Sequence, residues 1–318
     1  MRAATQTRYR ELVVRDDVPT PTCGAGDVLV RVRAAGLNTA DLLTMTGTPY
    51  IARPAFGFRR PRVPVRGSDV AGVVEAVGRD VTAFAVGDEV FGWCAGAFAE
   101  HAVTTPDRLA HKPSRLTFDQ AGGLVMAGVT ALHALDRAGV TAGSTVLVNG
   151  ASGGIGTFAV QLAKARGAEV TAVCSGRNAD LVRSLGADHV VDYTTTDFTR
   201  AGVRHDALLD IANNHTLTAL RRAVTRNGTL VLVGGRAGDW IGNLRGVAKA
   251  LALNLVTSQR IRVFVSLPSR ADLETLRALV ATDAVTPVVD RVFPLADAVE
   301  AFDHLATWRA RGKVVLTP

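Results

Sequence analysis

The chain has 318 residues, a length at which a single hydrophobic core usually stops growing, so we expect two domains. Hydrophobic residues make up 47% of the chain and charged residues 20%, which suits a folded protein. The formal net charge is +7, but the basic residues are scattered and form no run with interleaved aromatic residues. Composition therefore does not favour a nucleic-acid partner, and a bland basic surface is the better interpretation.

Cysteines and termini bear on the compartment. Cys23, Cys94 and Cys174 are far apart and odd in number, which predicts neither a disulfide framework nor paired metal ligands. The first residues lack an apolar signal core, and no run reaches the ~18 apolar residues of a membrane span. We expect a cytoplasmic protein without a membrane span.

The N-terminal third has the pattern of a β-rich unit. Residues 28–36 alternate apolar residues with arginine, and residues 69–78 form a β-branched run that ends at glycine. A tight turn is expected at 86–90. Beyond Pro113, residues 117–135 are apolar at helical spacing and lead into the next unit.

The segment from Thr145 to Arg177 carries the strongest signal in the chain. An apolar strand, residues 145–149, breaks on glycines, a helix-forming run follows, and a second strand is expected at 169–174. Such a βαβ unit of ~30 residues is the pattern of a dinucleotide site. Its glycines permit the tight turn, the approach of a pyrophosphate and the packing of helix on strand, at Gly150, Gly153 and Gly156 respectively. Backbone N–H groups at Gly154 to Gly156 would hold the phosphates.

The end of the second strand bears on which dinucleotide is bound. NAD sites usually place Asp or Glu about 20 residues past the glycines, to bond the ribose 2′-hydroxyl. No carboxylate lies between Val170 and Ala179, whereas Ser175 can donate a hydrogen bond and Arg177 can pair with a 2′-phosphate. NADPH is favoured over NADH, with an ordinary solvated Arg177 as the alternative.

Strand-like runs continue at 189–193, 207–212, 229–234 and 261–265, with helix-like sequence between most of them. The alternation predicts an α/β fold with a doubly wound parallel sheet. Residues 261–265 should form its edge, and an exposed apolar edge predicts a homodimer that joins two sheets. The apolar helix expected at 247–256 would cover that interface or a neighbouring cleft. The last segment should rejoin the first unit.

Seven segments together resemble the medium-chain dehydrogenase/reductase superfamily, and within it the zinc-free quinone oxidoreductase, zeta-crystallin-like branch. The segments are AAGLNTAD (34–41), PVRGSDVAGVVEAVG (64–78), VGDEVFG (86–92), GGLVMAGVTALHAL (122–135), VLVNGASGGIGTFAVQLAK (146–164), SLGADHVVDY (184–193) and GKVVL (312–316). The resemblance implies a GroES-like β-rich catalytic domain built from residues 1–119 and 267–318. It also implies a Rossmann NADPH-binding domain at 120–266, and a cleft for cofactor and substrate.

The resemblance also addresses zinc. Zinc alcohol dehydrogenases of this superfamily place Cys in the segment matching AAGLNTAD and His-Glu in the segment matching GSDVAG, where this chain has Asn38, Ser68 and Asp69. An amide and a hydroxyl do not replace the soft or imidazole ligands of a catalytic zinc, and no cluster of four cysteines is present. We expect no metal.

Without a Lewis acid, hydrogen bonds must polarise the acceptor, which favours a small hydrophobic quinone or α,β-unsaturated carbonyl. The resemblance implies that the Asn38 amide donates to the developing oxyanion or enolate, although a turn-forming asparagine is the alternative. Asp41 is expected to orient the backbone or Asn38. Tyr50 is the candidate proton donor, with an aromatic residue that only lines the site as the alternative.

The same matching implies contacts to the cofactor. Thr130 would lie by the nicotinamide ribose or phosphates, Ser152 to Ile155 on the pyrophosphate, and Tyr193 near the adenosine. Less specific matches are Gly234, Gly235, Phe264, Val265 and Lys313. His101, His111, His133 and His304 match no catalytic role, and structural histidines are expected there.

Two other functions compete with an NADPH-dependent quinone or enone reductase. One is an enoyl or keto reductase of a secondary-metabolite pathway, because residues 240–259 depart from compact quinone oxidoreductases and would form an apolar lid. The other is a non-enzymatic, NADPH-binding structural or RNA-binding protein, as some zeta-crystallin relatives are. The scattered charge argues against that third interpretation.

Overall fold

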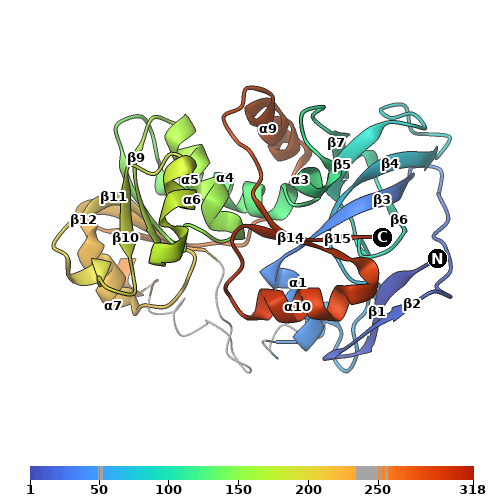
Figure 1. Ribbon diagram of the computed structural model, residues 1–318, viewed down its shortest axis with the longest axis horizontal. Helices are drawn as coiled ribbons and strands as arrows, with labels where there is room; N and C mark the ends of the chain where they lie inside the picture. Colours follow the sequence, from blue (N-terminus) through green and yellow to red (C-terminus); the bar gives the residue numbers. More distant parts are fainter. Residues whose placement is uncertain (49, 51–52, 234–249, 251, 255–256) are drawn as a thin grey trace. The chain divides into compact units, whose positions relative to one another are not determined.

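The structure is a computed structural model of the whole chain, and it describes all residues except 49, 51–52, 234–249, 251 and 255–256 (Figure 1). The chain packs as two compact units, one formed by residues 1–129 and 268–318 and the other by residues 130–267. Helix α4 (Val125–Ala138) runs from the first unit into the second. No helix among the described residues is long and apolar enough to cross a membrane.

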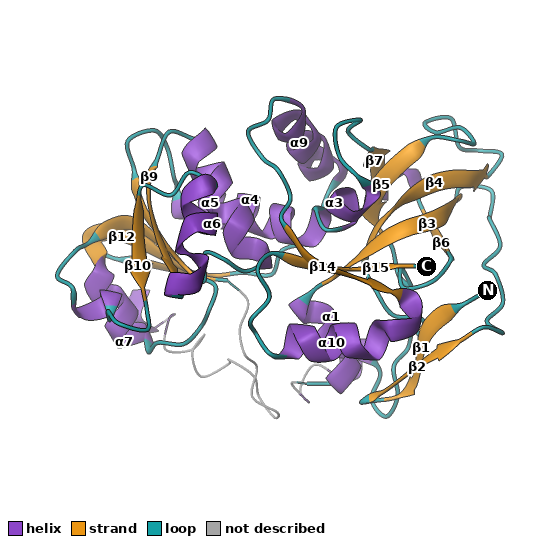
Figure 2. Cartoon of the chain, viewed as in Figure 1, coloured by secondary structure: helices purple, strands orange, loops and turns teal. Residues whose placement is uncertain are grey.

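The first unit is β-rich (Figure 2). Its main sheet has the order β14-β15-β3-β4-β5-β7, with β6 also paired to β3, and β1 and β2 form a separate hairpin. The strands are β1 (Ala3–Arg8), β2 (Glu11–Arg15), β3 (Val28–Leu37), β4 (Asp69–Val77), β5 (Glu89–Trp93), β6 (His101–Thr104), β7 (Leu109–His111), β14 (Val289–Pro294) and β15 (Lys313–Thr317). The helices are α1 (Thr39–Thr46), α2 (Arg53–Phe56), α3 (Phe118–Gly122), α9 (Arg270–Ala281) and α10 (Ala298–Ala306).

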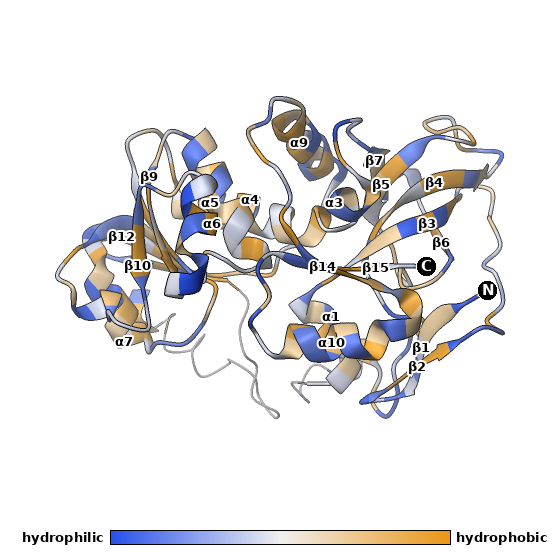
Figure 3. Cartoon of the chain, viewed as in Figure 1, coloured by the Kyte–Doolittle hydropathy of each residue, from blue (hydrophilic) through white to orange (hydrophobic). Residues whose placement is uncertain are grey.

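Chain ends meet in this unit because the C-terminal strand joins the sheet of the N-terminal residues. Strand β15 pairs antiparallel with β3, with Val314 opposite Leu37 and Leu316 opposite Ala35. Helix α10 packs on the same core through Ala298, Ala301 and Phe302, spaced three and four residues apart as a helix face requires. Figure 3 shows both hydrophobic and hydrophilic colours along α10. The last segment therefore rejoins the first unit, as the sequence predicts.

The second unit is a doubly wound parallel sheet with the strand order β10-β9-β8-β11-β12-β13. The strands are β8 (Thr145–Asn149), β9 (Glu169–Cys174), β10 (His189–Asp192), β11 (His205–Asp210), β12 (Val224–Leu232) and β13 (Arg260–Val263). The helices are α5 (Gly154–Ala165), α6 (Ala179–Ser184) and α7 (Leu217–Leu220). The order reverses between β8 and β11, and in open α/β sheets ligands bind outside the carboxyl ends of the strands at such a point.

Strands β8 and β9 have the bounds expected from the sequence, because buried β-branched runs flanked by glycine identify them locally. Strand β13 is an edge strand, as expected, since it pairs only with β12 among the named strands. It is shorter than predicted and ends at Val263. Of the expected helix at 247–256, the structure describes residues 250 and 252–254, and these are helical. The rest of that helix and most of the expected lid at 240–259 lie outside the described residues.

Candidate active site

The register of β15 against β3 brings the first group of candidate residues together. With Val314 opposite Leu37, Lys313 lies beside Asn38, although 275 positions separate them in sequence. The Lys313 Nζ atom donates to the Leu37 carbonyl oxygen at 2.8 Å and to Asn38 Oδ1. The sheet thus places a lysine on the side chain of the expected oxyanion donor.

Lys313 is a buried cation with a buried counter-charge. The residue is 3% exposed, and its Nζ atom lies 3.8 Å from Oδ2 of Asp69, which is 0% exposed. The Met126 backbone N–H donates to both carboxylate oxygens of Asp69, at 3.3 and 3.2 Å. Burial raises the pKa of the Asp69 carboxyl to about 7, and the Lys313 ammonium opposes that rise. Burial lowers the pKa of Lys313.

Asp41 orients the start of α1. Its Oδ2 atom accepts a hydrogen bond from the Asn38 backbone N–H at 2.9 Å, where Asn38 is the N-cap residue of the helix. Burial raises the pKa of the Asp41 carboxyl to about 6, while Lys313 and Arg66 lower it. This placement matches an orienting role for Asp41 on the Asn38 backbone.

The Asn38 amide is held in one orientation. An ammonium only donates hydrogen bonds, so the Asn38 atom that meets Lys313 must be Oδ1, and the NH₂ group points elsewhere. Its Nδ2 atom lies 3.3 Å from Ser68 Oγ and 3.4 Å from the Gly36 carbonyl oxygen. Both distances exceed the usual 2.7 to 3.2 Å of an N–H···O bond. The amide N–H groups are therefore fixed in direction but only weakly bonded.

The residues at the positions where the resemblance implies zinc ligands in zinc alcohol dehydrogenases do not fit zinc. Asn38 and Ser68 are within contact of each other, but their amide and hydroxyl are not the soft or imidazole ligands that zinc requires. The Lys313 ammonium already lies against Asn38 Oδ1 and near Asp69. A divalent ion there would face a buried like charge. Within the described part of the chain, no three His, Cys, Asp or Glu residues are placed to hold a metal.

Tyr50 lies beside an arginine in the segment that follows α1. The Arg53 guanidinium lies 4.4 Å from the centre of the Tyr50 ring and 4.6 Å from that of Tyr9, and Arg53 Nε donates to the Gly47 carbonyl. The structure therefore places Tyr50 in a cation–π stack at the end of α1. A role as proton donor stays a prediction.

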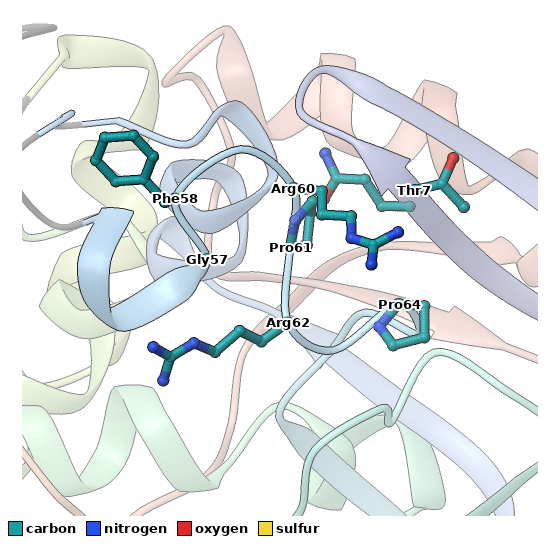
Figure 4. Close-up of a pocket in the computed structure, with 8 residues that line it drawn as sticks. Thr7, Gly57, Phe58, Arg60, Pro61, Arg62 and Pro64 are labelled. Atoms are coloured by element: carbon teal, nitrogen blue, oxygen red, sulfur yellow. The ribbon is translucent and has the colours of Figure 1, made fainter.

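A pocket of about 510 Å³ lies beside this stretch of chain, between β1 and the segment that follows α2 (Figure 4). It is lined by Gln6, Thr7, Gly57, Phe58, Arg60, Pro61, Arg62 and Pro64. Figure 4 shows the Phe58 ring and the Arg62 guanidinium both extending to the left of the view, and the Arg60 and Thr7 side chains to the right. None of its lining residues is Asn38, Asp41 or Lys313, so this pocket is distinct from the buried cluster.

The second group of candidates is the glycine loop between β8 and α5. Gly150 has φ +92°, which only glycine adopts freely, and a Cβ on Gly156 would lie 2.1 Å from the Gly150 carbonyl oxygen. A Cβ on Gly153 would meet only that oxygen, at 3.6 Å, so the fold itself does not require glycine there. Gly153 is the N-cap of α5, whose first turn includes Gly154, Ile155 and Gly156. A backbone left open at a helix N-terminus fits a dinucleotide pyrophosphate.

Asn178 ties this loop to the end of β9, a role that sequence reasoning missed. The residue is 4% exposed, and its Nδ2 atom donates to Ser152 Oγ at 2.9 Å. Ser175 is half-buried and precedes the short 3₁₀ helix Gly176–Asn178, and Arg177 is exposed. Ser152, Ser175 and Arg177 thus belong to one connected stretch of surface at the carboxyl ends of β8 and β9.

A carboxylate from a different strand, β10, also lies at the carboxyl end of β9. Asp192 ends β10, and a Cβ built on Gly176 would lie 2.4 Å from Asp192 Oδ2. Hydrogen bonds from Thr194 and from the Gly176 backbone lower the pKa of Asp192, so it is ionised at neutral pH. The end of β9 therefore carries an acidic residue, Asp192, as well as a basic one, Arg177.

The remaining candidates are more dispersed. Thr130 is half-buried on α4, Tyr193 is 54% exposed, and Val265 is 79% exposed. Phe264 stacks under the Arg137 guanidinium at 4.3 Å. Gly234 and Gly235 lie outside the described residues. The four histidines contact Glu75 (His101), Asp88 (His111), Ser266 (His133) and Asp290 (His304).

Polar residues at the carboxyl ends of β8 and β11 form a hydrogen-bond network next to the glycine loop. The sequence patterns did not predict this network. Asn149 Nδ2 donates to Asp210 Oδ1 at 2.7 Å and to Asn214 Oδ1 at 2.8 Å. Asp210 is 1% exposed, and burial raises its pKa. The Asn149 carbonyl accepts from Ile211 and Ala212. This network fixes the sheet edge at the point where the strand order reverses.

Comparison with known proteins gives two domain families. Residues 24–114 match the alcohol dehydrogenase GroES-like domain, and residues 185–316 match a family described as zinc-binding dehydrogenase. The chain is 32% identical over 316 residues to the chloroplast envelope quinone oxidoreductase homolog of Arabidopsis thaliana, a match that covers 95% of this chain and 92% of the relative. It is 34% identical over 325 residues to the mitochondrial NAD(P)H oxidoreductase RTN4IP1 of Mus musculus, covering 91% and 81%.

Another relative is the 2-methylene-furan-3-one reductase of Solanum lycopersicum, 31% identical over 335 residues, with 100% of this chain and 79% of the relative covered. Among solved structures, the quinone oxidoreductase of Coxiella burnetii superposes with a TM-score of 0.86 at 29% identity, covering 100% of this chain and 99% of that one. These similarities extend over both units.

Proposed function

This chain belongs to the medium-chain dehydrogenase/reductase superfamily, among its quinone oxidoreductases, and we propose that it reduces quinones or α,β-unsaturated carbonyls with NADPH. It is an oxidoreductase of a family that uses NAD(P)H. One observation carries the proposal: the Asn38 amide is locked by a buried lysine, with its N–H groups fixed in direction and weakly bonded. Such a group is suited to stabilise charge that develops on a substrate oxygen.

We propose NADPH rather than NADH because a basic residue, Arg177, follows the carboxyl end of β9. Arg177 can pair with a 2′-phosphate through its planar guanidinium, and Ser175 can donate to the same group. Asp192 weighs in the other direction, because its ionised carboxylate can accept from a ribose hydroxyl. The cofactor preference therefore depends on the balance between Arg177 and Asp192.

The bound nicotinamide supplies hydride, and the residues of this chain supply position and charge stabilisation. Asn38 donates to the carbonyl or quinone oxygen as negative charge builds on it. Lys313 holds Oδ1 of that amide, which keeps the N–H groups on one side. Asp41 fixes the Asn38 backbone through its N–H. Removing one such donor in other enzymes costs roughly 10² to 10³ in turnover.

The residues at the expected zinc positions do not fit zinc, and this bears on which substrates can accept the hydride. Hydrogen bonds alone polarise a simple ketone weakly, whereas quinones and enones accept hydride readily. The relative that reduces a 2-methylene-furan-3-one supports the enone arm, and the quinone oxidoreductases support the quinone arm. An enolate or hydroquinone anion can take its proton from water or from a side chain such as Tyr50. If water delivers the proton, Tyr50→Phe should lower turnover less than Asn38→Ala does. The buried and half-buried free cysteines fit a reducing compartment such as the cytoplasm.

Steady-state kinetics of Asn38→Ala on one quinone and one enone tests the proposal. We expect turnover to fall at least about tenfold with NADPH affinity nearly unchanged, the pattern of an interaction made mainly in the transition state. Ser68→Ala is the matched control, since it removes the hydroxyl that Asn38 Nδ2 contacts but keeps the amide. Its turnover should stay within about threefold of the wild type. Unchanged turnover for Asn38→Ala would mean that Asn38 only forms the turn before α1.

A further inference from the structure

A second pocket, of about 660 Å³, lies in the second unit at the amino ends of β11, β12 and β13. We call it the arginine pocket, and it is lined by Arg204, Arg221, Arg222, Arg226, Thr218, Thr257, Ser258 and Gln259. Arg204 directly precedes β11, and residues 257–259 directly precede β13. The glycine loop follows the carboxyl end of β8. Because the strands are parallel, the arginine pocket, at their amino ends, lies on the opposite side of the sheet from the glycine loop.

The pocket concentrates charge that is scattered in the sequence. Four of its lining residues are arginines and none is acidic. Within the ranges that the structure describes, no carboxylate forms an ion pair with any of the four. Arginines on one small surface repel one another, and their charges are most stable when an anion lies between them.

One of these arginines is held in place. Gln259 Oε1 accepts from Arg221 Nε at 2.8 Å, while Gln259 Nε2 donates to the carbonyl oxygens of Arg221, Val224 and Thr225 at 3.0, 3.0 and 3.2 Å. The bond uses only Nε, and the two terminal nitrogens of Arg221 have no hydrogen-bond partner among the residues that the structure describes, so they can donate to a ligand. Ser258 Oγ donates to the Arg226 carbonyl at 2.8 Å and anchors the same loop.

We propose that the arginine pocket binds a small anion with two or more phosphate groups, at a site separate from the cofactor loop. Guanidinium groups pair with phosphate oxygens in a planar, two-pronged geometry. One phosphate group carries a charge of about −1.5 to −2, so two groups are needed to balance four arginines. The pocket volume lies in the ~300–1,000 Å³ range of small-molecule sites. Thr257, Ser258 and Gln259 already donate to backbone carbonyl oxygens and hold the loop in place, so the arginines supply the contacts to the anion.

Calorimetric titration of the full-length protein with tripolyphosphate tests the site, in buffer that contains saturating NADPH. We expect binding to persist under saturation, because the pocket and the glycine loop lie at opposite edges of the sheet. Loss of tripolyphosphate binding on saturation would place it in the cofactor site and overturn the proposal.

Two charge-matched double variants locate the binding. Arg222→Gln with Arg226→Gln should weaken tripolyphosphate at least tenfold, whereas Arg31→Gln with Arg33→Gln, two exposed arginines of β3, should change it less than twofold. Equal weakening by both pairs would mean diffuse attraction by net charge, which also refutes a built site. A single-stranded oligonucleotide serves as the comparison probe. If it binds more tightly than tripolyphosphate and loses affinity through the same variant, the pocket contacts a nucleic-acid backbone and the small-anion assignment is wrong.

Discussion

Replacing Lys313 by methionine should destabilise the first unit in a pH-dependent way. The change keeps an unbranched side chain of similar length and removes only the charge and the donor. Two acceptors, the Leu37 carbonyl and Asn38 Oδ1, lose their partner, and Asp69 loses its counter-charge. Each buried acceptor left without a donor costs about 1–3 kcal/mol, which gives about 2–6 kcal/mol for the pair.

The pH dependence comes from Asp69. Its pKa in the folded protein is raised to about 7, above the value of an unfolded chain, so the folded state gains stability from holding the proton at low pH. That stability is lost as pH rises through the folded pKa. Lys313 lowers the pKa of Asp69, so its removal raises that pKa further and extends the loss to higher pH. One proton changes stability by at most about 1.4 kcal/mol per pH unit. Between pH 6 and pH 8 the wild type already loses about one such unit around its pKa of about 7, so through Asp69 the drop of the variant relative to wild type grows by at most about 1.4 kcal/mol.

Urea unfolding at pH 6 and pH 8 measures this difference. The Lys313→Met variant should show a larger drop in midpoint relative to wild type at pH 8 than at pH 6. The double variant Lys313→Met with Asp69→Asn is compared with Asp69→Asn alone, which also lacks the carboxyl group. Its extra drop from pH 6 to pH 8 should be smaller than that of Lys313→Met against wild type, because only Asp41, whose pKa Lys313 also lowers, still loses the ammonium. An equal drop for Lys313→Met at both pH values, or an undiminished pH-dependent drop in the double variant, would refute the coupling of Lys313 to Asp69.

Three further outcomes follow from the structure. Arg177→Ala should weaken NADPH by at least about tenfold and NADH much less, because a charge-assisted hydrogen bond contributes about 1.5–3 kcal/mol; equal affinity of the wild type for both cofactors would rule out the assigned role. Exhaustive chelation should leave activity intact, and stoichiometric zinc in active protein by elemental analysis would show that the metal-free assignment is wrong. Pairing of two β13 edges predicts a dimer, which light scattering at micromolar concentration checks, and a monomer there contradicts it.

Local patterns in the sequence sufficed for the start of the second unit, whereas the bounds of β11, β12 and β13 differ from the expected ones. The bounds of β8 and β9 and the loop between them follow from a buried β-branched run and three glycines, whose roles need only neighbouring residues. The same reasoning identifies β13 as an edge, since it is the last strand of the alternation.

Contacts between distant segments could not be predicted in this way. Lys313 was matched to the cofactor, but its bond to Asn38 depends on strand register across 275 positions. The residues at the end of β9 do not indicate a nearby carboxylate, because Asp192 belongs to the next strand, β10, and approaches Gly176 only in the folded sheet. Asn178 follows the end of β9 directly, but its hydrogen bond to Ser152 forms only when the glycine loop is folded. Scattered arginines likewise gave no hint of a shared pocket.

The position of Asp69 has a consequence for protein engineering. Its carboxylate accepts from the backbone of Met126, in the first turn of α4, and so contributes to the start of the helix that runs from one unit into the next. Introducing zinc ligands at Asn38 and Ser68 would leave Lys313 in the coordination space and would draw Asp69 away from that helix. A route from this chain to a metalloenzyme therefore needs simultaneous changes at the lysine and at the helix start, and single substitutions along it would pass through less stable proteins.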